Sequence, residues 1–170
     1  MTKRLLRLLV LAVSFLVTGA SCAGTGSGGE SVPLDYVRGR VEGYVLSSWL
    51  SSKPGDYVES LAIQGADKIV CRQTFEGMNP DGTVRVKTER SGTTAMEPSP
   101  FGGSEEVANF REGTEIVTVG GAQLVCTFLE GEGTKGRFKL WLSPAVPGAV
   151  VRMESPHGTL EVSSYKKTPE

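Results

Sequence analysis

The stretch EIVTVGGAQLVCTFLEGEGTKGRFKLWL, residues 115–142, decides the fold. It holds three runs of β-type residues, and Gly120-Gly121 separates the first run from the second. A Gly-Gly pair between two such runs is typical of a tight hairpin turn, because that turn needs positive φ. The stretch therefore predicts an antiparallel meander with strands at residues 115–119, 123–129 and 137–142.

Similar runs continue on both sides of this meander. They cover residues 57–63, 68–75 and 83–88 before it, and residues 149–153 and 159–164 after it. Asp81-Gly82 is a second hairpin signal, and the whole chain holds 22 glycines and nine prolines, which favours many turns. Residues 91–104 are expected to form a long loop between two halves. We therefore predict a mainly β protein built on a curved antiparallel sheet.

The two halves resemble each other. Lys68-Ile69-Val70-Cys71 and Gln123-Leu124-Val125-Cys126 each place a cysteine at the same point of an apolar strand. The sheet is accordingly expected to be either a half-barrel or two pseudo-repeated meanders.

One short N-terminal helix is expected before the strands. Val37, Val41, Val45 and Trp49 recur every four residues, which favours an amphipathic helix over residues 34–50. The glycines at positions 39 and 43 each cost a helix about 1 kcal/mol, and strand alternation fits the same stretch nearly as well. We expect the helix.

The N-terminus has the layout of an export signal. Lys3, Arg4 and Arg7 precede an apolar run at residues 8–17, and the small residues at 19–21 lead directly to Cys22. A membrane-spanning helix needs about 20 apolar residues, more than this run supplies. Ordinary secretory cleavage after position 20 or 23 is the other alternative.

Gly19-Ala20-Ser21-Cys22 resembles the lipobox of bacterial lipoproteins, with Gly19 where that motif usually has leucine. The resemblance implies a signal peptide at residues 1–21 and a Cys22 that carries diacylglyceryl and palmitate-type acyl chains, which together give stable anchoring. Residues 22–32 would then hold the lipidated cysteine and a flexible Gly/Ser tether, and residues 33–170 a single β-rich domain. Ala23 in place of aspartate favours the outer membrane, facing the periplasm; secretion is the alternative.

Processing changes both the charge and the cysteine count. Loss of three of the 18 basic residues leaves 15 against 19 acidic ones, a net charge of −4, which argues against nucleic-acid binding. Two cysteines remain, and Cys71 and Cys126 are expected either to form a disulfide or to be two buried thiols.

No catalytic constellation is apparent in the sequence. His157 is the only histidine and lies in a turn, so neither a metal site nor a Cys126–His157 nucleophile pair is expected. The adjacent acidic pairs, including Glu130 and Glu132, are expected at the surface. Gly24, Gly26 and Gly29 match a dinucleotide fingerprint but follow the signal core rather than a strand, so no cofactor is expected. Trp141 is expected either beneath the N-terminal segment or in a groove.

Residues 141–154, together with Val119-Gly120-Gly121 to Val125-Cys126 before them, resemble a pattern in uncharacterised secreted bacterial proteins, and the resemblance covers about residues 113–165. Those proteins look similar to the curved half-barrels of lipoprotein and lipid carriers. We therefore expect a lipid-anchored, non-enzymatic binding or structural module of the cell envelope, with an apolar ligand or an envelope protein as partner. A carrier of lipid or lipoprotein acyl chains on the concave sheet face is the first alternative, and a hydrolase is the second.

Overall fold

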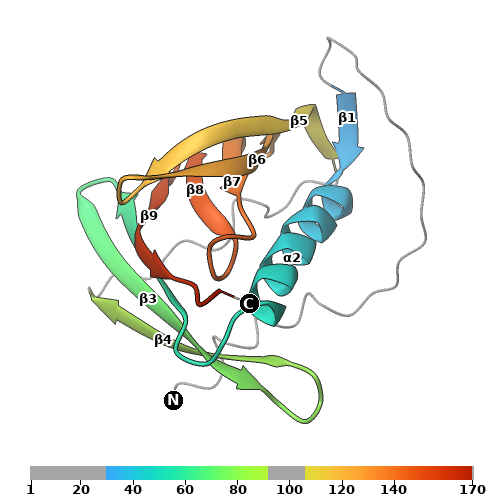
Figure 1. The fold of residues 1–170 in the computed structure, drawn as a ribbon. Coiled ribbons are helices and arrows are strands. Elements are labelled where there is room, and N and C mark those ends of the chain that lie inside the picture. Colours follow the sequence, from blue (N-terminus) through green and yellow to red (C-terminus); the bar gives the residue numbers. More distant parts are fainter. Residues whose placement is uncertain (1–29, 92–105, 170) are drawn as a thin grey trace, which may run out of the picture.

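The computed structural model describes residues 30–91 and 106–169. Nine strands form one antiparallel sheet in the order β1-β5-β6-β7-β8-β9-β2-β3-β4. The sheet is curved, as predicted (Figure 1). It is open because, among the described residues, no pairing joins β1 to β4. The strands are β1 (Glu30–Pro33), β2 (Tyr57–Gln64), β3 (Asp67–Met78), β4 (Val84–Ser91), β5 (Glu106–Val119), β6 (Ala122–Gly133), β7 (Gly136–Leu142), β8 (Val150–Ser155) and β9 (Gly158–Lys166).

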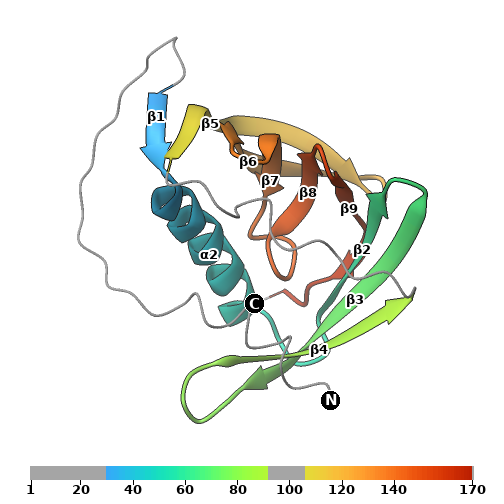
Figure 2. The same ribbon diagram turned by 180° about the vertical axis from the view of Figure 1, so that it is seen from behind.

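The single helix of the described residues closes the open side of the sheet. Helix α2 (Leu34–Leu50) has the predicted bounds and contacts both end strands, β1 and β4 (Figures 1 and 2). Its first half packs Leu34 and Val37 against side chains of β6 and β7. At its other end, the Trp49 ring stacks on Phe75 of β3, with the ring centroids 6.0 Å apart. The helix therefore fills the inner face of the sheet.

Strand alternation separates the inner face of the sheet from the outer one. In β7, Leu140 and Leu142 lie in the same hydrophobic cluster as Leu34 and Val37 of the helix. Trp141 between them points to the opposite face and is directly across from Phe128 of β6. Trp141 is 6% exposed and belongs to the hydrophobic cluster that also contains Trp49 of the helix, so its side chain is buried.

A buried carboxylate joins the end of the helix to the end of the described chain. Asp56 is fully buried, and its carboxylate accepts hydrogen bonds from the backbone N–H of Lys53 at 2.8 Å and of Thr168 at 3.0 Å. The Thr168 hydroxyl donates a third bond, at 2.7 Å. Burial alone raises the pKa of Asp56, but these three bonds outweigh it and hold the pKa below its ordinary value.

The folded part of the chain begins earlier than predicted. Glu30 to Val32, assigned to the tether by sequence, belong to β1, and Glu30 pairs with Phe110 of β5. The predicted signal peptide, Cys22 and the rest of the tether lie outside the described residues. Most of the predicted loop at residues 91–104 also lies outside them, and Ser91 is the last residue of β4.

Candidate functional site

Neither of the remaining cysteines is bridged. Cys71 lies on β3 and Cys126 on β6, both are buried, and both thiols are free. Four strands separate β3 from β6 in the sheet, whereas a disulfide needs Cα atoms about 4.4–6.8 Å apart. Of the two alternatives, the structure therefore has the buried thiols, and the disulfide expectation is corrected.

Cys126 is not arranged as a nucleophile. Its side chain has no exposed surface, and its thiol donates to the backbone oxygen of Leu124 at 3.7 Å. Burial raises the pKa of the Cys126 thiol, which disfavours the reactive thiolate. His157 is exposed in the turn between β8 and β9, as predicted. Within residues 30–91 and 106–169, no group of three or more His, Cys, Asp and Glu side chains is placed to hold a metal ion.

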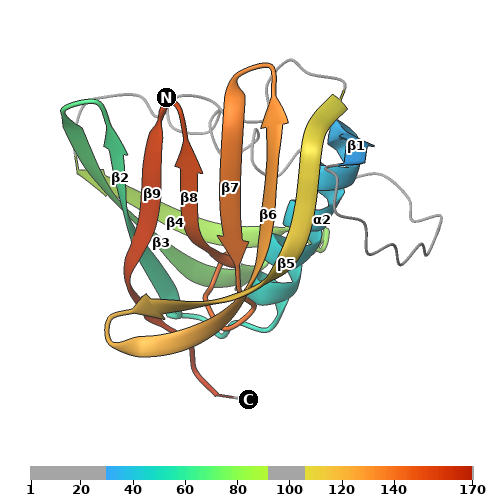
Figure 3. The ribbon, with the colours of Figure 1, turned by 90° about the horizontal axis from the view of Figure 1, so that it is seen from above.

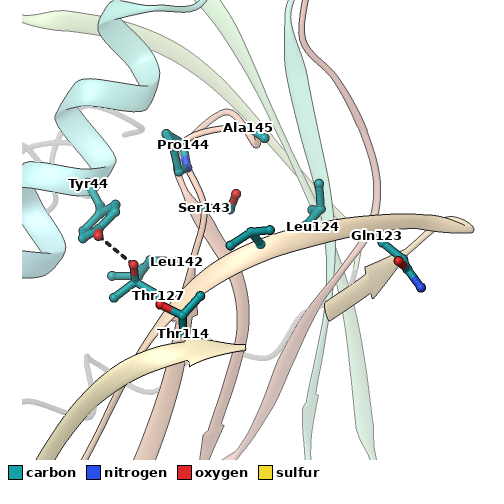
Figure 4. Close-up of a pocket in the computed structure, with 10 residues that line it drawn as sticks. Tyr44, Thr114, Gln123, Leu124, Thr127, Leu142, Ser143, Pro144 and Ala145 are labelled. Carbon is teal, nitrogen blue, oxygen red and sulfur yellow. Dashed lines mark hydrogen bonds between the residues drawn. The ribbon is translucent and has the colours of Figure 1, made fainter. Parts of the chain in front are cut away.

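A pocket of about 570 Å³ lies where the helix approaches the β5–β6 hairpin (Figure 4). Three elements form it: Tyr44 of α2, the segment that follows β7, and residues of the β5–β6 hairpin. The segment after β7 is held in place by a hydrogen bond from the backbone N–H of Ser143 to the oxygen of Ala149 at 2.8 Å. The lining residues are Tyr44, Thr114, Gln123, Leu124, Val125, Thr127, Leu142, Ser143, Pro144 and Ala145.

The lining of the pocket is uncharged. The Tyr44 and Thr127 hydroxyls share a hydrogen bond at 2.8 Å, which fixes the tyrosine ring against β6 (Figure 4). The other polar groups are hydroxyls and the Gln123 amide, and the rest of the surface is aliphatic. None of the ten residues carries a carboxylate, an imidazole, an amine or a thiol. This lining can bind a small apolar or neutral group, and it offers no side chain suited to move a proton near neutral pH.

A charged cluster occupies the opposite face of β5–β8. Glu130 is almost completely buried, with carboxylate oxygens 2.5 Å from Arg111 and 2.7 Å from Arg137. Lys139 bonds Glu115 at 2.6 Å, and Glu115 also accepts the indole N–H of Trp141 at 2.6 Å. The cations of Lys139 and Arg152 also lie over the Trp141 ring, at 4.7 and 5.3 Å from its centroid, so charged side chains cover this part of the tryptophan.

The cations keep both carboxylates ionised. The hydrogen bond from Arg111 is the main reason that the pKa of Glu130 lies below its ordinary value, despite burial. The bonds from Lys139 and Trp141 lower the pKa of Glu115 in the same way. Sequence analysis placed Glu130 at the surface, and this is wrong. The spacing of Glu130 and Glu132 gives no sign of it, because the cations around Glu130 come from the neighbouring strands β5 and β7.

Comparison with known proteins adds no assignment: no protein-family model, no curated protein and no solved structure matches this chain. Among the described residues, no helix combines the length and the apolar character needed to cross a bilayer.

Proposed function

We propose that this protein is a lipid-anchored module of the bacterial cell envelope that binds a partner through its surface and catalyses no reaction. The anchor is supported by the sequence, where a basic head, an apolar run and Gly19-Ala20-Ser21-Cys22 follow one another. The net charge of −4 after processing argues against nucleic acid as the partner. An outer-membrane location, facing the periplasm, fits Ala23 after the cysteine; secretion is the alternative.

One observation carries the choice of a surface module over an acyl-chain carrier: the inner face of the sheet is filled. Leu34, Val37 and Trp49 of the helix are each no more than 6% exposed, and they pack against both halves of the sheet. A carrier needs an empty apolar cavity at this position. Here the chain supplies its own apolar occupant, in the form of the helix.

The uncharged pocket favours a second candidate, a receptor for one small apolar group. Its volume of about 570 Å³ lies within the range of ligand pockets, and Leu124 and Leu142 contribute aliphatic surface to it. Such a ligand would bind between the helix and the β5–β6 hairpin instead of inside the sheet.

Native mass spectrometry of protein purified from its own membrane separates these candidates. A surface module is expected to give the mass of the processed, lipidated chain alone. A co-purified lipid or acyl chain that is lost on Tyr44→Ala substitution would support the receptor. A bound acyl chain that survives this substitution would indicate a site inside the sheet and would refute both.

The anchor is tested separately by Cys22→Ser substitution. We expect the substituted chain to lose palmitate labelling and to leave the membrane fraction. If the substituted chain stays membrane-bound with unchanged labelling, the lipoprotein proposal is wrong, whatever the outcome for the binding surface.

A further inference from the structure

One edge of strand β5 is left without a neighbouring strand. β5 pairs with β6 from Ala108 to Val119, but β1 covers its other edge only between Glu106 and Phe110. In the part of the chain that the structure describes, no strand pairs with this edge from Arg111 to Val119. The ribbon of β5 accordingly runs along the rim of the sheet (Figures 1 and 3). Its backbone groups on that side are free to pair with another strand.

The opposite end of the sheet shows how this chain protects an edge. β4 carries charged residues at four of its eight positions, namely Arg85, Lys87, Glu89 and Arg90. Charged side chains on an edge strand oppose pairing with other chains. Residues 113–119 contain one charged residue, Glu115, and its carboxylate is held on the other face by Lys139 and Trp141. The β5 edge therefore lacks the protection that β4 has.

The exposed face beside this edge is uncharged and partly apolar. Ile116 is 66% exposed and Val125, directly across from it on β6, is 67% exposed. Thr114 and Thr118 flank Ile116 on the same face of β5. Two large aliphatic side chains therefore lie side by side in water, next to a strand edge that can pair.

We propose that the β5 edge pairs antiparallel with the same edge of a second copy of this chain, about a two-fold axis at Ile116. The symmetry requires that position 116 faces position 116 of the copy and that Thr114 faces Thr118. Ile116 then completes a row of four aliphatic side chains across four strands, with Val125 at each end. Cross-strand pairs of this kind stabilise a sheet.

The charges select this register over its neighbour. A shift of the axis to Glu115 would set two carboxylates directly opposite each other, which is destabilising. About Ile116, Glu115 instead faces Val117, while Glu112 and Arg111 face the glycines at positions 120 and 121. Pairing is limited to residues 113–119, because the partner hairpin turns at residues 120 and 121. It therefore does not reach the part of β5 that β1 covers.

Analytical ultracentrifugation of the purified full chain, in a detergent matched to the buffer density, tests the association. We expect a reversible monomer–dimer equilibrium, with a dissociation constant that rises at least tenfold on Ile116→Lys, since two ammonium groups would then meet at the axis. Met78→Lys is the matched control, because Met78 is an exposed apolar residue of β3 and lies away from the β5 edge. The proposal is overturned if the wild-type chain stays monomeric up to about 1 mM, even if it binds a strand of another protein. It is also overturned if the Ile116→Lys variant dimerises as tightly as the wild-type chain.

Cysteine cross-linking tests the register. Ile116→Cys is expected to form a 116–116 disulfide under mild oxidation, identified by mass spectrometry of the linked peptides. Thr118→Cys lies on the same strand and face, but in this register position 118 faces position 114 of the copy. The two cysteines at position 118 are therefore offset by four residues, about 13 Å along the strands, which is too far for a disulfide. Equal cross-linking of the two variants, or none at position 116 in a chain that dimerises, refutes the pairing.

Discussion

Replacement of Trp49 by alanine tests whether the helix is an integral plug of the sheet. Trp49 is 4% exposed, stacks on Phe75, and has ring atoms within 3.1–3.5 Å of the position that a Cβ would take on Gly148. An aromatic side chain buries about 150–250 Å², which at about 25 cal/mol per Å² corresponds to roughly 4–6 kcal/mol of transfer free energy. Partial collapse of the cavity reduces this amount, so we expect the free energy of unfolding to fall by about 3–5 kcal/mol.

Urea denaturation followed by fluorescence and circular dichroism measures this change. The chain has two tryptophans, so Trp141 remains as the fluorescent reporter in the Trp49→Ala variant. Leu50→Ala is the matched control, because Leu50 is next in the chain, lies on the same last turn and is 56% exposed. The control should change the free energy of unfolding by no more than about 0.5 kcal/mol. Similar small losses in the two variants would show that the helix is not a plug and would refute the reasoning.

Three further results are expected. The pKa of Glu130 is lowered in the folded state, so its contribution to stability is present above the unfolded pKa and is lost as the pH falls through the folded pKa. Glu130→Gln should therefore lower the free energy of unfolding by about 1–2 kcal/mol at pH 7, and this free energy should then decrease less as the pH is lowered. Glu132→Gln, at an exposed position of the same strand, is the matched control and should leave the free energy of unfolding at pH 7 unchanged. Asp56→Asn weakens the three hydrogen bonds that the buried carboxylate accepts from Lys53 and Thr168, and it should lower the free energy of unfolding by about 2 kcal/mol in thermal or urea denaturation. A decrease below about 0.5 kcal/mol would show that these bonds do not stabilise the fold. Cys71 and Cys126 should resist a thiol reagent in native buffer and react in urea, and rapid native labelling of either would show that it is not buried.

The helix was predictable because its signal is local. Val37, Val41, Val45 and Trp49 define its buried side, and Pro33 lies directly before its first residue. Gly39 and Gly43 do not break it, since the packing of the helix against the sheet outweighs their cost. The strands were predictable for the same reason, as runs between turn residues.

The first half of β5 was missed because it departs from strand alternation. Asn109 has a φ of 52°, and the register with β6 shifts between Ala108 and Arg111. An extra residue at such a bulge interrupts the pattern on which a prediction depends. β1 is only four residues long, and only its pairing with β5 identifies it as a strand.

The candidate site was less predictable because its parts come from distant segments. Tyr44 and Thr127 share a hydrogen bond across 83 positions of the chain, and Glu130 is buried by cations that sequence spacing does not bring to it. Neither contact leaves a local pattern. The first contact follows from the packing of the helix on the sheet, and the second from the strand register, which sets Arg111 and Lys139 directly across from Glu130.

The place of β2 in the sheet has a consequence for the order in which the strands can assemble. β2 lies between β3 and β9, and Tyr57 at its start pairs with Lys166 of β9. The hairpins β2–β3 and β3–β4 can form from local contacts, but they join the remaining strands only through the long-range pairing of β2 with β9. Until that pairing forms, their inner faces stay uncovered, which is the condition under which folding intermediates aggregate. Closure of the sheet between β2 and β9 is therefore expected to be a slow step of folding.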